Sequence, residues 1–259
     1  MAKLPPFPGT SGRRDWRTAL DAIGKLMANG DDTTQVFRIM RALNVGNAAR
    51  NYARLLATEQ GGRIAYDRVE LAPRFSDPAY VARFAPGTVG AAYRDFLAET
   101  GYSADGLVEV SKVAPSLDGM PHPYAWLGRR VRDCHDIWHV LTGYKADESL
   151  GEASLAAFSF AQVGGLGWAL IASAAAAKSV RVTGTALFAK AVWEGYRNGR
   201  HARWISGEDY LQLLDEPIDV ARARLGIREP VAYLRAQREL GAELASYLSA
   251  PKAVKPLPI

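Results

Sequence analysis

The chain has 259 residues, of which 48% are hydrophobic and 23% are charged. This composition is ordinary for a folded protein and excludes disorder over most of the length, while the length allows one large domain or two small ones. A single cysteine, Cys134, excludes an internal disulfide framework and fits a reducing compartment. The net charge of +5 suits an anionic partner, which could be nucleic acid, a membrane surface or an acidic small molecule.

The two ends of the chain differ in composition from the region between them. Residues 1–14 carry three bases and no acid, together with several prolines, so we expect residues 1–15 to form a flexible basic arm. We find no repeat and no linker in residues 16–250, which we predict to be a single domain, and residues 251–259 form a basic tail. Because the N-terminus lacks the apolar segment of a secretory signal, we expect a cytoplasmic protein.

Hydrophobic periodicity and capping residues predict helices along nearly the whole chain. Asp15 is placed to cap the first helix, and Gly101 and Gly143 are placed to end two later ones. Only residues 62–71 alternate as a short extended segment would. We therefore predict an all-α fold, a single multi-helical domain, with helices at 16–28, 33–58, 88–100, 124–141, 149–163, 166–199, 208–214, 217–225 and 230–248.

One uncharged run, residues 153–177, requires a choice between a membrane span and a buried element. Its 25 residues are enough to cross a bilayer. However, three glycines, Gln162 and many alanines weaken a single apolar helix. We predict a helix pair in the interior that lines an apolar cavity, and the alternative is plain core.

Two histidines, His135 and His139, lie four residues apart in the predicted helix 124–141. Because each residue of an α-helix advances about 100°, their imidazoles project from one face one turn apart, which is typical of a chelating pair. Asp136 falls in the same sector and can supply an oxygen ligand or orient a histidine. The alternative is a helix surface that carries unrelated polar groups.

A further ligand must come from another element, and Glu152 is the best candidate. It opens the uncharged helix 149–163, where the helix N-terminus favours a carboxylate that would be costly to bury without a partner. Glu148, in a more polar run, is a weaker rival, and Cys134 points away from the histidines as a packed side chain would. Mixed nitrogen and oxygen ligands suit a divalent metal such as Zn²⁺, Fe²⁺, Mn²⁺ or Co²⁺.

Two known metalloenzyme motifs fit these residues less well. A zincin needs HExxH, in which glutamate is the general base, whereas the second residue here is Asp136. An HD-domain phosphohydrolase uses a His-Asp pair together with distant ligands, for which the chain offers only two other histidines, His122 and His201. That class stays open as an alternative.

The motif and its surroundings resemble the ubiquinone (coenzyme Q) biosynthesis protein four family. That family has HDxxH followed after eleven residues by glutamate. Here HDIWHVLTGYKADESLGE places twelve residues between His139 and Glu152 and keeps the family's Leu-Gly-Glu. The stretch FAPGTVGAAYRDFLAETGYSAD, residues 84–105, is similar to the family's Pro-x-Gly-Ser/Thr segment, and residues 193–227 resemble its Asn-Gly-Arg region. The resemblance covers roughly residues 35–228.

The resemblance implies an enzyme of ubiquinone biosynthesis, a metal-dependent carboxy-lyase that removes the ring carboxylate of a polyprenyl-hydroxybenzoate, with or without hydroxylation of the same carbon. The alternative is a non-catalytic scaffold that binds the isoprenoid lipid and organises the other ubiquinone biosynthesis enzymes. It also implies an apolar lipid-binding groove, walled by residues 153–177, and a homodimer that contacts the inner face of the membrane peripherally. The metal ligands and catalytic residues would be His135, Asp136, His139 and Glu152.

A basic segment, residues 178–203, contains six Lys or Arg residues and a single acid. Within it we expect Arg197, Arg200 and Tyr196 to bind substrate, with Arg203 on the same face if the helix continues. Such a patch can capture a carboxylate or contact anionic lipid headgroups, and ordinary ion pairs are the alternative. Nucleic-acid binding is disfavoured, because no recognisable binding motif accompanies the charge.

Overall fold

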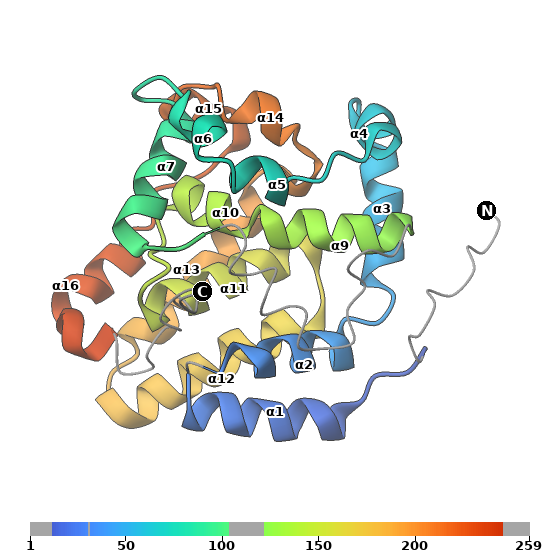
Figure 1. Ribbon diagram of the computed structural model, residues 1–259. Helices are drawn as coiled ribbons and strands as arrows, with labels where there is room; N and C mark the ends of the chain where they lie inside the picture. The colour runs from blue at the N-terminus through green and yellow to red at the C-terminus, as the bar shows by residue number, and fades with distance from the viewer. Residues whose placement is uncertain (1–11, 31, 104–121, 246–259) are drawn as a thin grey trace, which may run out of the picture.

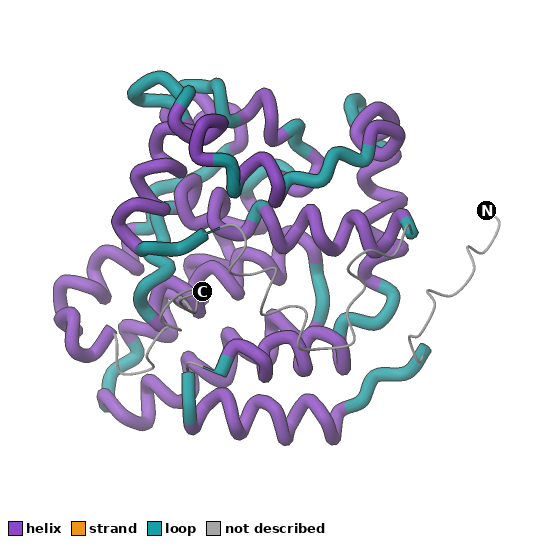
Figure 2. Tube along the Cα trace, viewed as in Figure 1, coloured by secondary structure: helices purple, strands orange, loops and turns teal. Residues whose placement is uncertain are grey.

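The structure, a computed structural model, describes residues 12–30, 32–103 and 122–245. Within these residues the fold is a single all-helical domain, which confirms the predicted fold class. Figure 2 shows the helices joined by short loops. The predicted arm, residues 1–15, is described only from its twelfth residue, and the predicted tail, residues 251–259, lies outside the described residues.

The helices stack in layers (Figure 1). The lower layer consists of α1 (Trp16–Ala28), α2 (Thr33–Leu43) and α12 (Leu166–Thr183). The middle layer consists of α9 (Pro123–Asp133), α10 (His135–Thr142), α11 (Ser149–Val163) and α13 (Leu187–His201).

The upper layer of Figure 1 contains mostly short helices. These are α5 (Ala72–Phe75), α6 (Pro78–Ala82), α7 (Val89–Thr100), α14 (Tyr210–Leu213) and α15 (Ile218–Leu225). At the sides lie α3 (Asn47–Leu56) with α4 (Gly61–Asp67), and α16 (Val231–Ala245), while a 3₁₀ turn, η1 (Ile205–Gly207), follows α13.

Several helix boundaries are set by the local signals that the sequence contains. The helices predicted at 16–28 and 149–163 are α1 and α11, with the same limits. The Asp15 carboxylate accepts the Thr18 N–H at 3.0 Å, which satisfies one of the free donors of the first turn. Gly143, with φ of +76°, ends α10 in the left-handed conformation that glycine adopts without strain.

Two long predicted helices are each divided by a glycine. The prediction of one helix over 33–58 was wrong, because Gly46 has φ of +76° and separates α2 from α3. The prediction of one helix over 166–199 was wrong for the same reason, because Gly184 has φ of +69° between α12 and α13. An isolated glycine inside a periodic segment costs only about 1 kcal/mol, so periodicity alone did not reveal the breaks.

The extended segment predicted at 62–71 was wrong, because its first part is the helix α4. Ile64 and Ala65 are adjacent buried residues, which one helical turn can direct into the interior together. A strand would also need a partner, and across the described residues the only extended pairing is the isolated bridge of Thr88 with Pro217. The apolar residues of this segment are therefore spaced as in a helix, but α4 has only seven residues, which is too few for the helical period to be recognised in the sequence.

The uncharged run, residues 153–177, is divided between α11 and α12 by Gly164 and Gly165, both of which have positive φ. The run is therefore two helices, as predicted. Most of α11 is buried, and α12 contacts α1, α2, α11 and α13. Among the described helices, none combines the length and apolarity needed to cross a membrane.

The closest helix packing in the middle layer, between α11 and α13, depends on glycine. A Cβ atom on Gly195 would lie 2.4 Å from the Ser154 carbonyl oxygen, and one on Gly199 would lie 2.6 Å from the Phe158 carbonyl oxygen. Both distances are too short for any side chain. The two backbones can therefore approach closely only because these positions lack a Cβ, and this contact fixes where α11 lies.

Candidate metal centre

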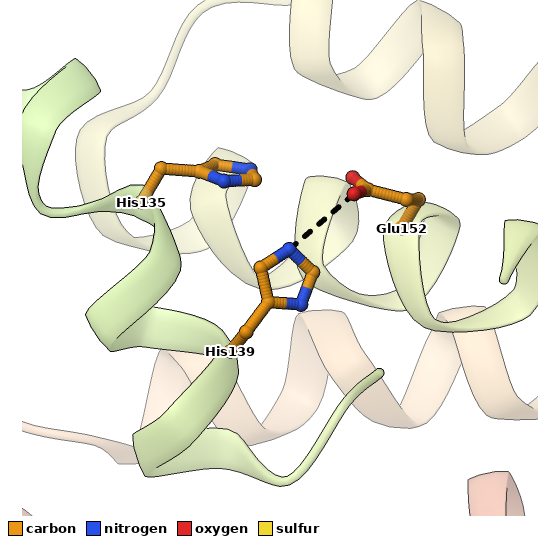
Figure 3. A group of neighbouring side chains, drawn as sticks. All are labelled: His135, His139 and Glu152. Carbon is orange, nitrogen blue, oxygen red and sulfur yellow. Dashed lines mark ion pairs between the residues drawn. The ribbon is translucent and has the colours of Figure 1, made fainter. Parts of the chain in front are cut away.

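The histidine pair lies at the start of a short helix of its own. Cys134, with φ of −88° and ψ of −3°, separates α9 from α10, so the single helix predicted over 124–141 was wrong. His135 and His139 nevertheless project from one face of α10, and their ring centroids are 4.8 Å apart. Both rings are directed toward the carboxylate of Glu152 on α11 (Figure 3).

The orientation of the His139 ring is set by the backbone. Its Nδ1 lies 2.8 Å from the Tyr144 carbonyl oxygen, which can only accept, so Nδ1 carries a proton and Nε2 is the ring nitrogen left to face the site. The side chain is 1% exposed, and Nε2 is a buried atom without a hydrogen-bond partner. The ring of Phe96 stacks on it at 6.1 Å. A buried ring nitrogen directed at a carboxylate fits a metal ligand.

The turn after α10 brings that carbonyl group back to the histidine. The Gly143 N–H donates to the His139 carbonyl oxygen at 2.8 Å, and its positive φ reverses the chain. The next residues are anchored from α16, because the Lys145 N–H donates to the Tyr233 hydroxyl oxygen at 3.0 Å. The sequence therefore fixes the ring of His139 through a glycine turn and a distant tyrosine.

Glu152 reaches the histidines because the first turn of α11 packs tightly on this loop. A Cβ atom on Gly151 would lie 1.9 Å from the Lys145 carbonyl oxygen, so the contact requires glycine. Glu152 Oε1 then lies 3.4 Å from His139 Nε2. The loop between the two ligands is one residue longer than the motif it resembles, and the glutamate still reaches the pair.

Glu148, the weaker rival, is bound elsewhere. Its carboxylate accepts hydrogen bonds from the Tyr233 hydroxyl and, at 2.7 Å, from the Gln237 side-chain amide, both on α16. It therefore ties α16 to the loop and does not join the histidines. This arrangement supports the choice of Glu152 over Glu148 as the third member of the site.

Three side chains form a group that could hold a metal ion: His135, His139 and Glu152, whose ligand atoms all lie within 4.8 Å of one another. His135 and Glu152 are 21% and 34% exposed, so the group opens to solvent on one side. Asp136, predicted as a fourth ligand, does not belong to this group. Its Oδ1 lies 3.5 Å from His135 Nδ1, a position suited to orienting the ring so that Nε2 faces the site.

The charges of the group reinforce one another. Burial opposes ionisation of Glu152, but the neighbouring His139 and His135 outweigh it and lower the pKa of the carboxyl. Burial likewise opposes charge on His135, but the hydrogen bond that its ring donates to Asp136 and the charges of Glu152 and Asp136 raise its pKa. A cation is therefore electrostatically favoured at this position, whether it is a proton or a metal ion.

The residues predicted to bind substrate make no hydrogen bond or ion pair with the metal-ligand group among the described residues. Arg197 and Arg200 are exposed on α13, and Tyr196 is half-buried between two other aromatic rings. The condition under which Arg203 would share their face is not met, because α13 ends at His201. In the described part of the chain no hydrogen bond or ion pair links these side chains to the metal-ligand group, and their role in substrate binding stays a prediction.

The remaining candidate ligands have structural roles. Cys134 is fully buried, and burial raises the pKa of its thiol, as expected for a packed side chain. His122 caps α9, where its Nδ1 accepts the Tyr124 N–H at 3.1 Å. His201 Nδ1 lies 3.0 Å from the Arg228 guanidinium. Neither histidine joins the group, so neither supplies the additional ligand that an HD-domain phosphohydrolase requires.

Two aromatic residues beside the group were not singled out from the sequence. Phe96 stacks on His139 and also contacts Tyr102, whose ring centroid is 6.1 Å away. The Tyr102 hydroxyl donates to the Ala146 carbonyl oxygen at 3.2 Å. Burial and the nearby Glu152 raise the pKa of Tyr102. Both residues lie in YRDFLAETGY, and the resemblance of this stretch to a family segment was the only signal that the sequence offered for them.

A pocket of about 290 Å³ lies beside Tyr102, among α5, α6 and α7. No residue of the run 153–177 lines it, although that run was predicted to wall the lipid groove. The lining is mostly apolar, with polar atoms from two serines and one arginine, and consists of Phe75, Ser76, Pro78, Val81, Ala82, Arg94, Leu97, Tyr102 and Ser103.

Comparison with known proteins gives a consistent result. The family model described as "Coenzyme Q (ubiquinone) biosynthesis protein Coq4" matches residues 25–231. A mitochondrial ubiquinone biosynthesis protein coq4 from Pyrenophora tritici-repentis is 30% identical over 73% of this chain, and the match covers 63% of that protein. Its counterpart in Ajellomyces capsulatus is 24% identical over 93% of this chain and 88% of its own length.

One solved structure has the same fold. A putative ubiquinone biosynthesis protein from Nostoc punctiforme superposes with a TM-score of 0.63 at 22% identity, over 83% of this chain and the whole of that one. At this identity the likeness concerns the fold alone. This chain spans less than two thirds of the length of the Pyrenophora relative.

Proposed function

This chain belongs to the Coq4 family of coenzyme Q (ubiquinone) biosynthesis proteins, and on that premise we propose that it is a metal-dependent enzyme of this pathway. The proposed reaction is removal of the ring carboxylate from a polyprenyl-hydroxybenzoate. One observation carries the proposal: the buried Nε2 of His139 has no hydrogen-bond partner and lies 3.4 Å from Glu152 Oε1. A buried polar nitrogen without a hydrogen-bond partner is costly, and coordination to a metal ion would satisfy it.

His135, His139 and Glu152 would hold the ion, and the partial exposure of His135 and Glu152 supports a catalytic rather than a purely structural site. Structural metal sites are usually closed by four protein ligands, whereas catalytic sites keep a position for substrate. A bound divalent ion would supply Lewis-acid stabilisation of negative charge on the ring as carbon dioxide leaves. The protein's own contribution is to fix the ligands, and the carbonyl of Tyr144 does this for His139.

The aromatic side chains next to the group would shield the substrate ring from water. Phe96 covers one face of His139, and Tyr102, which interacts electrostatically with Glu152, also lines the pocket. Because its pKa is raised, the Tyr102 hydroxyl stays protonated at neutral pH and acts as a hydrogen-bond donor. These properties suit a neutral wall beside an anionic reaction centre.

The pocket beside Tyr102 supports an apolar substrate. Its lining is dominated by carbon, from residues such as Phe75, Val81 and Leu97. Each methylene group of an isoprenoid that enters such a surface contributes about 0.8 kcal/mol to binding. The pocket is therefore a candidate for the part of the polyprenyl tail nearest the ring.

A second function, a lipid-binding scaffold for the other ubiquinone enzymes, is favoured by the same pocket. A scaffold would need the apolar cavity but no open metal position, and a metal would then join α10 to α11 as a structural element. Association with those enzymes and a homodimeric state belong to this proposal, as does contact with a membrane. The fungal relatives are named as mitochondrial proteins, so the expected cytoplasmic location of this chain stays a prediction.

The two functions are separated by single-turnover decarboxylation. Protein purified with its metal, and protein loaded with Zn²⁺ or Fe²⁺, would be incubated with a polyprenyl-hydroxybenzoate labelled in the carboxylate, with and without dioxygen. Labelled carbon dioxide is expected, and it should be lost in His139→Ala and Glu152→Gln. Glu148→Gln is the matched control, because that carboxylate lies one turn away and binds α16. Release that persists in folded His139→Ala would refute the enzyme, and no release from any metal form would favour the scaffold.

A further inference from the structure

One peptide group, made of the Tyr144 carbonyl and the Lys145 N–H, is hydrogen-bonded both to the metal centre and to α16. Its carbonyl oxygen lies 2.8 Å from Nδ1 of His139, and its N–H donates to the Tyr233 hydroxyl oxygen at 3.0 Å. A trans peptide group is planar, so its N–H and C=O bonds point in opposite directions along one rigid unit. A side chain that holds the N–H therefore also holds the carbonyl group that orients His139.

The Tyr233 hydroxyl has a partner for its proton and for its oxygen. It donates to the carboxylate of Glu148, which can only accept, and its oxygen accepts the Lys145 N–H and, at 2.8 Å, the side-chain amide of Gln237. The residue is fully buried. Burial and the hydrogen bond to Glu148 raise the pKa of the hydroxyl, so it stays protonated at neutral pH and keeps donating to the carboxylate.

These bonds form a chain in which every donor points the same way. His139 Nδ1–H donates to the peptide carbonyl oxygen, the peptide N–H donates to the Tyr233 hydroxyl, and that hydroxyl donates to Glu148. In such a chain each bond polarises the next, and the effect is larger in a buried region than in water. The negative charge at the end of the chain therefore makes the carbonyl oxygen a stronger acceptor and Nε2 of His139 a stronger electron donor toward a metal.

Tyr233 is itself held in place by two other elements. Its backbone N–H and that of Ala232 donate to the carboxylate of Glu194 on α13, at distances from 2.8 to 3.1 Å, which fixes the start of α16. Its ring meets the Tyr144 ring edge to face, with the centroids 5.1 Å apart. The hydroxyl therefore lies at a fixed position relative to the peptide group that it holds.

We propose that Tyr233 is a positioning residue of the metal centre, which aims His139 at the ion and strengthens it as a ligand through one peptide group. A metal-binding histidine generally donates its second N–H to a carboxylate or a carbonyl group that lies next to it. Here the carboxylate of Glu148 would act from farther away, through the tyrosine and the peptide, although it does not touch either histidine. The proposal rests on the metal centre of the proposed function and not on the proposed reaction.

Zinc affinity gives the first test, measured in Tyr233→Phe by competition against a chromophoric chelator. Phenylalanine keeps the ring that packs on Tyr144 and removes the hydroxyl. Loss of a group that supports a metal ligand lowers the affinity by about 10- to 100-fold, and we expect about tenfold here because the hydroxyl acts through a peptide group. Arg235→Gln is the matched control, since Arg235 lies on the same helix in an exposed ion pair with Glu239, and it should bind zinc as the unaltered protein does.

The Nδ1 proton of His139 gives the second test and separates the hydrogen-bond chain from simple support of the loop. Its NMR resonance, identified by its absence from His139→Ala, is followed in metal-free protein, so this test does not depend on zinc occupancy. The resonance should move upfield in Tyr233→Phe, because the carbonyl group becomes a weaker acceptor, and should not move in Arg235→Gln. A fall in zinc affinity with an unmoved resonance would overturn the chain, as would an unchanged affinity.

Two variants at the end of the chain keep the proposal testable if Tyr233→Phe does not fold. Glu148→Ala removes the last acceptor and should move both readouts in the same direction, whereas Glu148→Gln keeps an acceptor oxygen and should move them less. If Glu148→Ala matched the unaltered protein in both readouts, the proposal would be wrong. Failure of the unaltered protein to bind zinc would refute the metal centre itself, while full zinc affinity in Tyr233→Phe would overturn only the role of this tyrosine.

Discussion

A single methyl group added at Gly151 should disable the metal centre. In Gly151→Ala the new Cβ would lie 1.9 Å from the Lys145 carbonyl oxygen, and an ordinary contact requires at least about 3.4 Å. About 1.5 Å of movement is therefore needed. If α11 moves, Glu152 leaves His139; if the loop moves, the neighbouring carbonyl of Tyr144 leaves the His139 ring.

Either displacement exceeds what a metal site tolerates, since ligand distances must stay within about 0.2 Å of their preferred values. We expect the affinity for Zn²⁺ to fall by about 10- to 100-fold, as it does when the support of a ligand is lost. The strain should also destabilise the fold by about 1–3 kcal/mol, reduced by the roughly 1 kcal/mol by which alanine favours a helix over glycine.

The measurement is zinc competition against a chromophoric chelator, together with urea denaturation of the metal-free protein. Gly128→Ala is the matched control, because Gly128 is an exposed position inside α9 with no atom within 4 Å of its new Cβ. That variant should keep its zinc affinity and be as stable as the original or slightly more so. If Gly151→Ala bound zinc as tightly as Gly128→Ala, the close contact would not be what positions Glu152.

Three other predictions concern stability. Removal of metal with a chelator should lower the midpoint of thermal unfolding, because an ion at a hundred times its Kd stabilises the fold by about 2.7 kcal/mol. In His139→Ala the midpoints with and without chelator should be the same. Gln162→Leu should lower the free energy of unfolding, measured in urea, by about 2–6 kcal/mol. The reason is that the buried Gln162 amide donates to the Gly199 carbonyl oxygen at 2.7 Å and accepts the Ile205 N–H at 2.9 Å, and leucine would leave both backbone groups without a partner. The control Gln212→Leu, at an exposed position, should lower it far less. In metal-free protein the lowered pKa of Glu152 stabilises the fold at pH values above the pKa that this carboxyl has in the unfolded chain, and this stability is lost as the pH falls through the folded-state pKa. Glu152→Gln should therefore make the free energy of unfolding, measured against pH, fall less steeply on the acid side. An unchanged pH dependence would contradict the charge interaction assigned to Glu152.

Features of the fold that depend on neighbours in the sequence could be predicted from it. Asp15 caps α1 and Gly143 ends α10 through bonds that span three or four residues, so the residue types alone were informative. The histidine pair was equally local, because helical geometry alone places His135 and His139 on one face. The choice of Glu152 needed the resemblance to a family as well.

Features that depend on contacts between distant segments could not be predicted. The side of α13 that faces solvent is decided by where Gly195 and Gly199 meet α11, so the arginines could not be assigned a direction beforehand. The break at Gly46 was hidden for a similar reason, since a glycine inside a periodic segment fits a continuous helix and a turn equally well. The role of Tyr144 could not be read from its side chain at all, because its carbonyl group makes the contact.

That contact has a consequence for how the sequence can vary. Every amino acid has a carbonyl group, so a replacement at Tyr144 would not in itself remove the acceptor that orients His139. The conformation that delivers the acceptor belongs to Gly143, whose φ of +76° strains other residues. Among natural variants that keep the metal centre, glycine at this position should therefore be retained more strictly than the identity of the residue that makes the bond.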